Sequence, residues 1–218
     1  MAAGDPVKPQ ILSARLISNI DRSFAARFKL RPDQRSLGLV TCDIDDSLYV
    51  ALDEATKMAE VEVVYAHSFY AGADHASGPL SGEIIGMLAG PDPAEVRAGL
   101  NACIAYTEQE AWFTSANADD SLAFFAHTIS RTGSYLSKEA GIDEGTPLAY
   151  LIAPPIEATY ALDAALKAAE VEMQVWFEPP SETNFSGGLL SGSQSACRAA
   201  CAAFGDTVMD VARSPVKF

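Results

Sequence analysis

Basic residues are scarce in this chain of 218 residues, which has 15 Lys and Arg against 29 Asp and Glu and a formal net charge of −14. Binding to nucleic acid or to anionic lipid requires clustered Lys and Arg that displace counterions. We therefore expect no nucleic-acid partner and no membrane-surface partner. Cations or basic partners fit this charge better.

Long apolar runs are also missing. The first ten residues, MAAGDPVKPQ, lack the hydrophobic segment of a signal peptide, and the chain contains no run of about 18 apolar residues. The sequence thus predicts no membrane span and a cytoplasmic location. Apolar residues still make up 49% of the chain, which is enough to form buried cores.

Reactive residues are few and isolated. His67, His75 and His127 form no H-E-x-x-H motif, and the chain lacks a G-x-S-x-G motif and a Gly-rich phosphate loop. The four cysteines include no C-x-x-C pair, which favours buried free thiols over metal or redox chemistry. An enzyme would have to be assembled from residues that are remote in sequence.

What the chain does contain is an internal repeat. Residues 51–63, ALDEATKMAEVEV, return 110 positions later as residues 161–173, ALDAALKAAEVEM. A period near half the chain length gives each copy enough residues for a core of its own. We therefore predict two tandem domains, residues 1–112 and residues 113–218, whose differences indicate different local tasks.

Strand and helix patterns alternate in both copies. Copy one predicts strands at 11–18, 36–42, 61–68 and 82–90, and helices at 21–28, 46–60 and from the capping sequence Asp92-Pro93-Ala94-Glu95 onward. Copy two repeats the order, with strands at 121–130, 147–153 and 171–178, helices at 156–169 and 194–213, and a strand-to-helix junction, LLSGSQSACRAAC, before the last helix. This interleaving predicts an α/β fold (an α+β layer) in each copy, with helices packed on a small sheet.

The repeated block also carries a family resemblance. Lys57 is followed by MAEVEVV and Lys167 by AAEVEMQ, and each copy continues through a loop to a strand and an Ala-rich helix. This arrangement resembles the bacterial microcompartment shell domain. Further segments extend the likeness, over almost the whole chain, to the tandem-domain, circularly permuted, trimeric shell proteins of the ethanolamine-utilisation compartment: DEATK, VEVVY, YAGA, GPDPAE, RAGL, SRTGSYLS, AYLIAPPIEATY, PPSETN and GSQSAC.

The resemblance implies a fold, an assembly and a function. It implies two circularly permuted shell domains, a homotrimer whose six domains mimic a hexagon, and tiling edge to edge with other shell proteins in a compartment shell. It implies no catalysis and no required cofactor. Ethanolamine would be the transported small molecule, and cobalamin would associate with a gated central pore.

One group of candidate residues is acidic and occurs once per chain. Asp45 and Asp46 stand at the start of a helix, where a single carboxylate is an ordinary N-cap. Copy two reads Ala-Pro-Pro-Ile at this point, so the fold does not require the pair. Glu83 also lacks an acidic counterpart, and Phe113 offers either an aromatic face for a cation or a hydrophobic plug. The resemblance places Asp45, Asp46, Glu83 and Phe113 around a small ethanolamine-binding channel.

Two loops, 69–80 and 178–188, follow equivalent strands and differ in length. Taken alone, their Gly, Pro, Ser and Asn content indicates solvent-exposed connections. The resemblance implies that they meet on the trimer axis and open or close a larger pore. The bulky residues in that position would be Tyr70, His75 and Phe185.

Lys57 and Lys167 occupy the same helix position in the two copies. A lysine at the C-terminal end of a helix also complements the helix dipole. The resemblance places both lysines at the edge of the tile, against a neighbouring tile.

Two other functions stay open from the residues alone. The first is a small-molecule-binding regulatory protein built from the same duplicated α+β domain, which would form discrete oligomers and not sheets. The second is an enzyme that uses Asp45, Asp46 and Glu83 as a divalent metal site.

Overall fold

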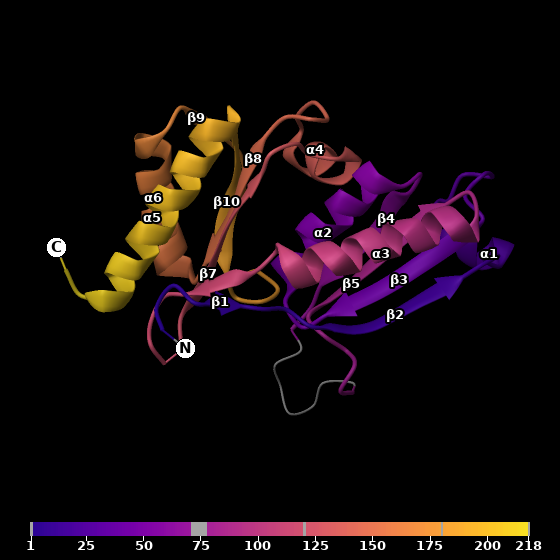
Figure 1. The fold of residues 1–218 in the computed structure, drawn as a ribbon, viewed down its shortest axis with the longest axis horizontal. Coiled ribbons are helices and arrows are strands. Elements are labelled where there is room, and N and C mark those ends of the chain that lie inside the picture. The colour runs from indigo at the N-terminus through magenta and orange to yellow at the C-terminus, as the bar shows by residue number, and fades with distance from the viewer. Residues whose placement is uncertain (1, 71–77, 120, 180, 218) are drawn as a thin grey trace. The chain divides into compact units, whose positions relative to one another are not determined.

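A computed structural model describes residues 2–70, 78–119, 121–179 and 181–217. Its contacts divide the chain into two compact units (Figure 1). The N-terminal unit consists of Pro9–Ala111 with Gly133–Leu136, and the C-terminal unit consists of Met1–Lys8, Trp112–Thr132 and Ser137–Phe218. Residues 1–8 therefore belong to the C-terminal unit, and residues 133–136 belong to the N-terminal unit, although each segment lies in the other half of the sequence.

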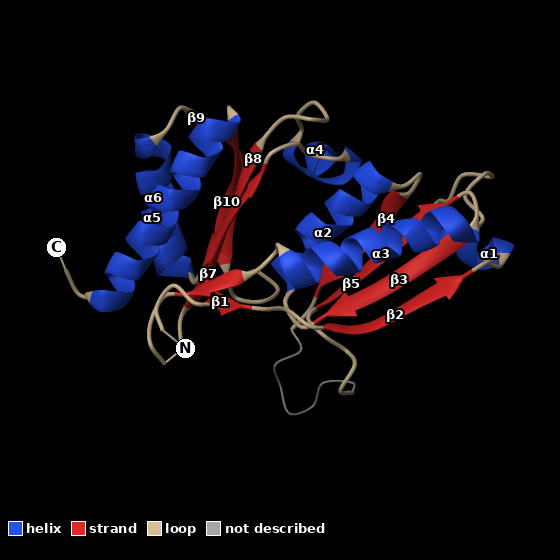
Figure 2. Ribbon diagram, viewed as in Figure 1, coloured by secondary structure: helices blue, strands red, loops and turns tan. Residues whose placement is uncertain are grey.

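The N-terminal unit is built on a four-stranded antiparallel sheet (Figure 2). Its strand order is β2 (Ile11–Ile17), β3 (Ser36–Cys42), β5 (Ile84–Gly90) and β4 (Glu62–Ser68). Helices α2 (Asp45–Met58) and α3 (Pro93–Gln109) pack against each other and against this sheet. Helix α1 (Arg22–Ala25) and a 3-10 helix (Ala26–Phe28) connect β2 to β3.

The C-terminal unit carries a six-stranded antiparallel sheet. Its order is β1 (Pro6–Val7), β6 (Phe113–Ser115), β7 (Ala123–Ile129), β8 (Leu148–Ala153), β10 (Ser186–Gly192) and β9 (Val171–Phe177). Helices α5 (Pro155–Ala168) and α6 (Gln194–Arg213) lie side by side on it. Helix α4 (Ser134–Ala140) follows β7.

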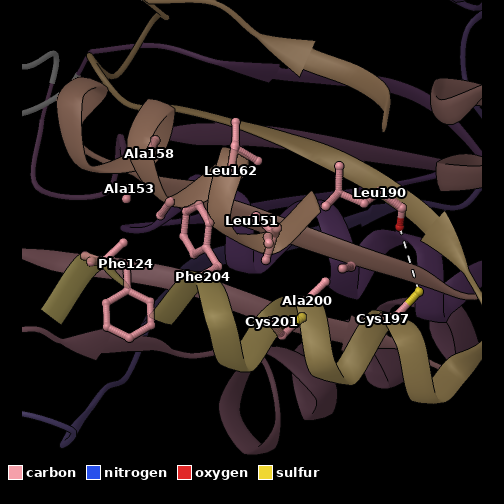
Figure 3. Close-up of a cluster of buried hydrophobic side chains, with 14 of the residues drawn as sticks. Phe124, Leu151, Ala153, Ala158, Leu162, Leu190, Cys197, Ala200, Cys201 and Phe204 are labelled. Atoms are coloured by element: carbon pink, nitrogen blue, oxygen red, sulfur yellow. Dashed lines mark hydrogen bonds between the residues drawn. The ribbon is translucent and has the colours of Figure 1, made fainter. Parts of the chain in front are cut away.

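Small side chains let α6 approach this sheet closely. Its buried face carries Cys197, Ala200, Cys201 and Phe204, which pack with residues such as Leu151 and Leu190 (Figure 3). A Cβ added at Gly205 would lie 2.9 Å from the ring of Phe124, closer than atoms normally approach. The small side chains of α6 therefore form a close-packing surface.

Most elements agree with the sequence prediction. The strand predicted at 36–42 and the helix predicted at 194–213 are confirmed residue for residue. The short strands β1 and β6 and the helix α4 were missed, because their few residues show no clear periodicity. No helix in the described part of the chain has the length and apolar character needed to cross a membrane.

The capping prediction at α3 is half right. The Asp92 carboxylate accepts hydrogen bonds from the backbone N–H of Ala94 and Glu95, at 2.7 and 3.0 Å. A full capping box would also have the Glu95 carboxylate accept from the backbone N–H of Asp92, and this half of the prediction is wrong, because that carboxylate accepts instead from the backbone N–H of Glu60 at 2.7 Å. Glu95 thus fixes the connection after α2 instead of closing its own capping box.

A buried carboxylate joins α2 to the start of α4. Asp53 is fully buried and accepts hydrogen bonds from the backbone N–H of Gly133 at 2.7 Å and of Leu136 at 2.8 Å. The hydroxyl of Thr56 accepts from the backbone N–H of Ser134 at 3.1 Å. Burial raises the pKa of Asp53, while the two backbone N–H groups and Lys57 oppose that shift. Side chains of α2 therefore cap α4.

Substituting Asp53 by Ala should destabilise the fold strongly. The change leaves two backbone N–H groups buried without an acceptor, each of which costs about 1–3 kcal/mol. We expect the free energy of unfolding to fall by about 2–5 kcal/mol, measured by urea denaturation. Asp163→Ala is the matched control, because Asp163 occupies the repeat-equivalent position but is exposed, and it should change stability by about 0.5 kcal/mol or less. Equal losses in both variants would contradict the capping role.

Candidate functional site

The first turn of α2 holds the acidic pair. The N-cap is Ile44, which makes no side-chain capping bond, so the interpretation of one aspartate as the N-cap is wrong. Asp45 and Asp46 are the first two helical residues and are each only 6% exposed. The backbone N–H of Asp46 donates to the Asp45 carboxylate at 2.9 Å. Two carboxylates are thus buried at the positive end of the helix dipole.

Hydroxyl groups adjoin the pair at the end of β4. Burial raises the pKa of Asp45, and a hydrogen bond with the Ser68 side chain opposes that shift. The Ser68 hydroxyl also lies 2.8 Å from the hydroxyl of Tyr49. Burial raises the pKa of Tyr49 to about 12, so its phenol stays neutral. The site therefore combines carboxylate acceptors with hydroxyl groups that both donate and accept.

Glu83 joins the same region from the loop before β5. Its backbone N–H donates to the carbonyl of Cys42, and its carbonyl accepts from the N–H of Phe69, both at 2.8 Å. The preceding Gly82 has φ +64, and a Cβ there would lie 2.2 Å from the Cys42 carbonyl oxygen. Only glycine tolerates this turn. The backbone of Glu83 is thus held between the ends of β3 and β4.

The Glu83 carboxyl is half-buried and titrates near neutral pH. Desolvation raises its pKa first, and the nearby charges of Asp45 and Asp43 raise it further, to about 7. The structure therefore brings Asp45, Asp46 and Glu83, which the repeat comparison singled out as one-sided, into one region. We call these three residues the acidic cluster. The repulsion between its carboxylates becomes smaller when a cation binds beside them, so the cluster favours cation binding.

Three polar residues of this region were missed in the sequence. At the repeat spacing of 110, Tyr49 aligns with Thr159 and Ser68 aligns with Glu178. Both residues thus differ between the two copies, as Asp45 does, and this difference is the signal that could have found them. Ser47 is fully buried, and its hydroxyl has no hydrogen-bond partner within the described chain. Across the described ranges, no three His, Cys, Asp or Glu side chains are placed to hold a metal ion.

Phe113 belongs to the C-terminal unit, in β6. It is buried, with its ring centroid 5.2 Å from that of Phe125 and 5.9 Å from that of Phe185, the latter edge to face. Its ring thus packs among aromatic residues of its own unit. Its role in the small channel stays a prediction.

The residues expected at the larger pore lie in different environments. Tyr70 is exposed, whereas Phe185 is half-buried against Phe113 and follows Asn184, which has a left-handed φ of 64°. His75 lies outside the described residues. Tyr70 is therefore the better placed of the two described residues to meet a partner.

The two repeat lysines are not equivalent. The Lys57 side chain is 12% exposed and lies 2.5 Å from Glu54 and 3.7 Å from Asp53. The Lys167 side chain is 75% exposed and pairs with Asp163 at 2.6 Å. Lys167 is thus free to reorient toward another molecule, while Lys57 is held by carboxylates of its own helix.

Comparison with known proteins places the fold in a family. A family model described as the BMC domain matches residues 36–117. The chain is 60% identical to the bacterial microcompartment shell protein EutL of Clostridium perfringens, over 98% of this chain and 99% of that protein. It is 54% identical to EutL of Escherichia coli, over 100% of this chain and 99% of that protein.

Solved structures agree. The ethanolamine utilization protein EutL from Leptotrichia buccalis is 58% identical and superposes with a TM-score of 0.97, covering 99% of this chain and 100% of that chain. These matches confirm the predicted shell-domain fold and a structural, non-enzymatic function, and they do not support the regulatory alternative. They also place the protein in the shell of a cytoplasmic compartment. The chain belongs to the EutL family of bacterial microcompartment shell proteins.

Proposed function

We propose that this shell protein admits protonated ethanolamine through a small channel lined by the acidic cluster. The observation that supports this most is the convergence of Asp45, Asp46 and Glu83, which the fold does not need and the second copy lacks. Aliphatic amines keep their proton at neutral pH, and clustered carboxylates favour the entry of cations. The similar protein from Leptotrichia buccalis, which is named an ethanolamine utilization protein, also supports this substrate.

The hydroxyl groups of Tyr49 and Ser68 can bind the hydroxyl end of ethanolamine. Ethanolamine carries an ammonium group and a hydroxyl group two carbons apart, and the Tyr49 and Ser68 hydroxyls adjoin the carboxylates. One unit-charge pair at 4 Å is worth about 4 kcal/mol at an effective dielectric of 20, before desolvation takes much of it back. The net affinity should be weak. Weak binding suits transport, because a tightly held solute would not leave.

The proposal includes the assembly that the family implies. Shell membership means that the protein assembles with other shell proteins. We further propose a homotrimer, in which loops 69–80 and 178–188 surround a larger pore where cobalamin would associate. Glu83 supports a link between the two pores, because its carbonyl accepts from the N–H of Phe69 at the base of the first loop. A ligand at Glu83 shifts that loop only by its differential affinity for the loop states.

Neutralising the acidic cluster should abolish ethanolamine binding. Calorimetry of the wild-type protein should show weak binding of one ethanolamine per chain, and the variant Asp45→Asn, Asp46→Asn, Glu83→Gln should show no heat above dilution. The control Asp163→Asn, Glu157→Gln, Glu170→Gln removes the same number of charges from helix α5 and from the second residue after it, in copy two. It should bind as the wild type does. Equal heats in the wild type and in the acidic-cluster variant would refute the site.

Binding should strengthen as pH rises through about 7. The Glu83 carboxyl has its pKa raised to about 7, so it is protonated and uncharged at pH 6 and ionised at pH 8, while the amine stays protonated. We expect the dissociation constant to fall several-fold between these pH values, as measured by calorimetry, with proton release during binding. Glu83→Gln should flatten this dependence. An equally steep pH profile in that variant would assign the titration to another group.

Lys167→Glu should block sheet formation and leave the trimer intact. Like charges would meet along every shared edge of identical tiles, so electron micrographs should show isolated particles. Lys57→Glu is a less direct test, because a carboxylate there would contact Asp53 and Glu54 and destabilise α2. If the Lys167 variant formed sheets of normal extent, Lys167 would not lie at the tile edge.

A further inference from the structure

One aromatic residue beside the acidic cluster comes from the second half of the sequence. Tyr135 lies in the segment Gly133–Leu136, which belongs to the N-terminal unit. Its ring stacks on the ring of Tyr49, with centroids 6.4 Å apart and planes at 20°, which is within the range of favourable aromatic pairs. The hydroxyl of Tyr49 in turn lies 2.8 Å from that of Ser68. Tyr135 therefore contacts the hydroxyl side of the site through Tyr49.

Hydrogen bonds to α2 hold the backbone on both sides of Tyr135. The Asp53 carboxylate accepts from the backbone N–H of Gly133 at 2.7 Å and from that of Leu136 at 2.8 Å. A Cβ added at Gly133 would lie 2.7 Å from the Asp53 carbonyl oxygen, so glycine is needed for this close approach. The base of the Tyr135 side chain is thus fixed relative to α2.

Tyr49 stands between two buried carboxylates along α2. Asp45 precedes it by four residues and Asp53 follows it by four, a spacing that places successive side chains next to each other on one side of a helix. At the repeat spacing of 110, α5 carries Thr159 in place of Tyr49, and Thr159 is exposed. The stacked tyrosine therefore occurs once per chain, as the acidic cluster does, and the repeated fold does not require it.

The hydrogen bonds around Ser68 have a fixed direction while Asp45 is ionised. A carboxylate only accepts, so the Ser68 hydroxyl donates its single proton to Asp45. The Ser68 oxygen then accepts the proton of the Tyr49 hydroxyl. Burial raises the pKa of Tyr49 to about 12, so this proton is present at neutral pH. The Tyr49 oxygen is left as an acceptor for a hydroxyl group of a ligand.

The value of this acceptor depends on where the Tyr49 ring lies. A change in χ1 moves the terminal oxygen of a tyrosine further than any other atom of its side chain. The Tyr49 side chain is only half-buried, and it packs against the apolar core of the N-terminal unit together with Tyr135. The stacked ring of Tyr135 limits the rotation that would carry the Tyr49 oxygen away from Ser68.

We propose that Tyr135 is a positioning residue for ligand selection, because its ring holds the Tyr49 oxygen where it accepts the hydroxyl proton of ethanolamine. This inference rests on the proposed binding of ethanolamine at the acidic cluster. The carboxylates attract the ammonium group of any small amine. The Tyr49 oxygen separates an amino alcohol from a plain amine, because a site built to bind a hydroxyl group disfavours an analogue that lacks it. Tyr135 thus acts on selectivity and not on attraction.

A comparison of ethanolamine with ethylamine tests this assignment. Ethylamine has the same ammonium group and the same two carbons but no hydroxyl, and both amines are protonated at pH 8. Calorimetry on the wild type should show that ethanolamine binds about 3- to 10-fold more tightly, the size expected for one hydrogen bond. Tyr135→Leu should bind the two amines equally, whereas Tyr135→Phe, which keeps the ring, should keep the wild-type preference. Partial unfolding lowers both affinities alike, so their ratio reports on positioning.

A double-mutant cycle separates positioning from general packing. Tyr49→Phe removes the acceptor and should abolish the preference for ethanolamine. Adding Tyr135→Leu to that variant should change the ratio of affinities no further, because Tyr135 acts through the Tyr49 oxygen. Tyr65→Leu is the matched control, since Tyr65 is an exposed tyrosine on β4 of the same unit, and it should keep the wild-type ratio.

The possible results separate this inference from the proposed function. A Tyr135→Leu variant that keeps the wild-type preference would overturn the positioning role alone, as would a loss of preference that Tyr65→Leu shares. A wild type that binds both amines equally tightly would do the same and leave the acidic cluster as an amine site. A wild type that binds neither amine would overturn the proposed function together with the role of Tyr135.

Discussion

The buried carboxylate of Asp53 is the interaction on which the N-terminal unit depends. It accepts two backbone N–H groups at the start of α4 and so holds that segment over α2. Tyr135 is then placed to stack on Tyr49, whose hydroxyl lies beside Ser68 and the acidic cluster. A carboxylate is costly to bury, and it stays stable only while its hydrogen-bond donors are in place. The covering segment and the site are therefore coupled through α2.

Burial raises the pKa of carboxyl groups in the acidic cluster as well, but the groups that surround them differ from those around Asp53. Asp53 is compensated by N–H donors, whereas desolvation and neighbouring charge raise the pKa of Glu83 to about 7. The Asp53 carboxylate accepts two backbone N–H groups, whereas the Glu83 carboxyl faces the negative charges of Asp45 and Asp43. A bound cation relieves that repulsion. This difference is the physical reason for placing binding at Glu83 and stability at Asp53.

The sequence predicted the fold well and the site in part. Repeated apolar periodicity located β3 and α6 to the residue, and one-sided acids pointed to Asp45 and Glu83. The different environments of Lys57 and Lys167 were not predicted, because the two lysines occupy the same helix position; the signal was the replacement of Glu54, which pairs with Lys57, by Ala164 in the second copy. Tyr49 and Ser68 were missed since their relation to Asp45 depends on how β4 ends beside α2. Such contacts are set by tertiary packing and not by spacing along the chain.

Duplication placed the same aspartate in two different environments. Asp53 of α2 is fully buried and accepts hydrogen bonds from backbone N–H groups at the start of α4. A buried carboxylate of this kind is stable because its hydrogen-bond donors belong to the same chain. Asp163 of α5 lies at the equivalent repeat position, is exposed and pairs with Lys167 in water, at little cost in free energy. The residue type alone therefore does not fix the role of this position: the donors packed around each aspartate decide whether it stabilises the fold or only contributes surface charge.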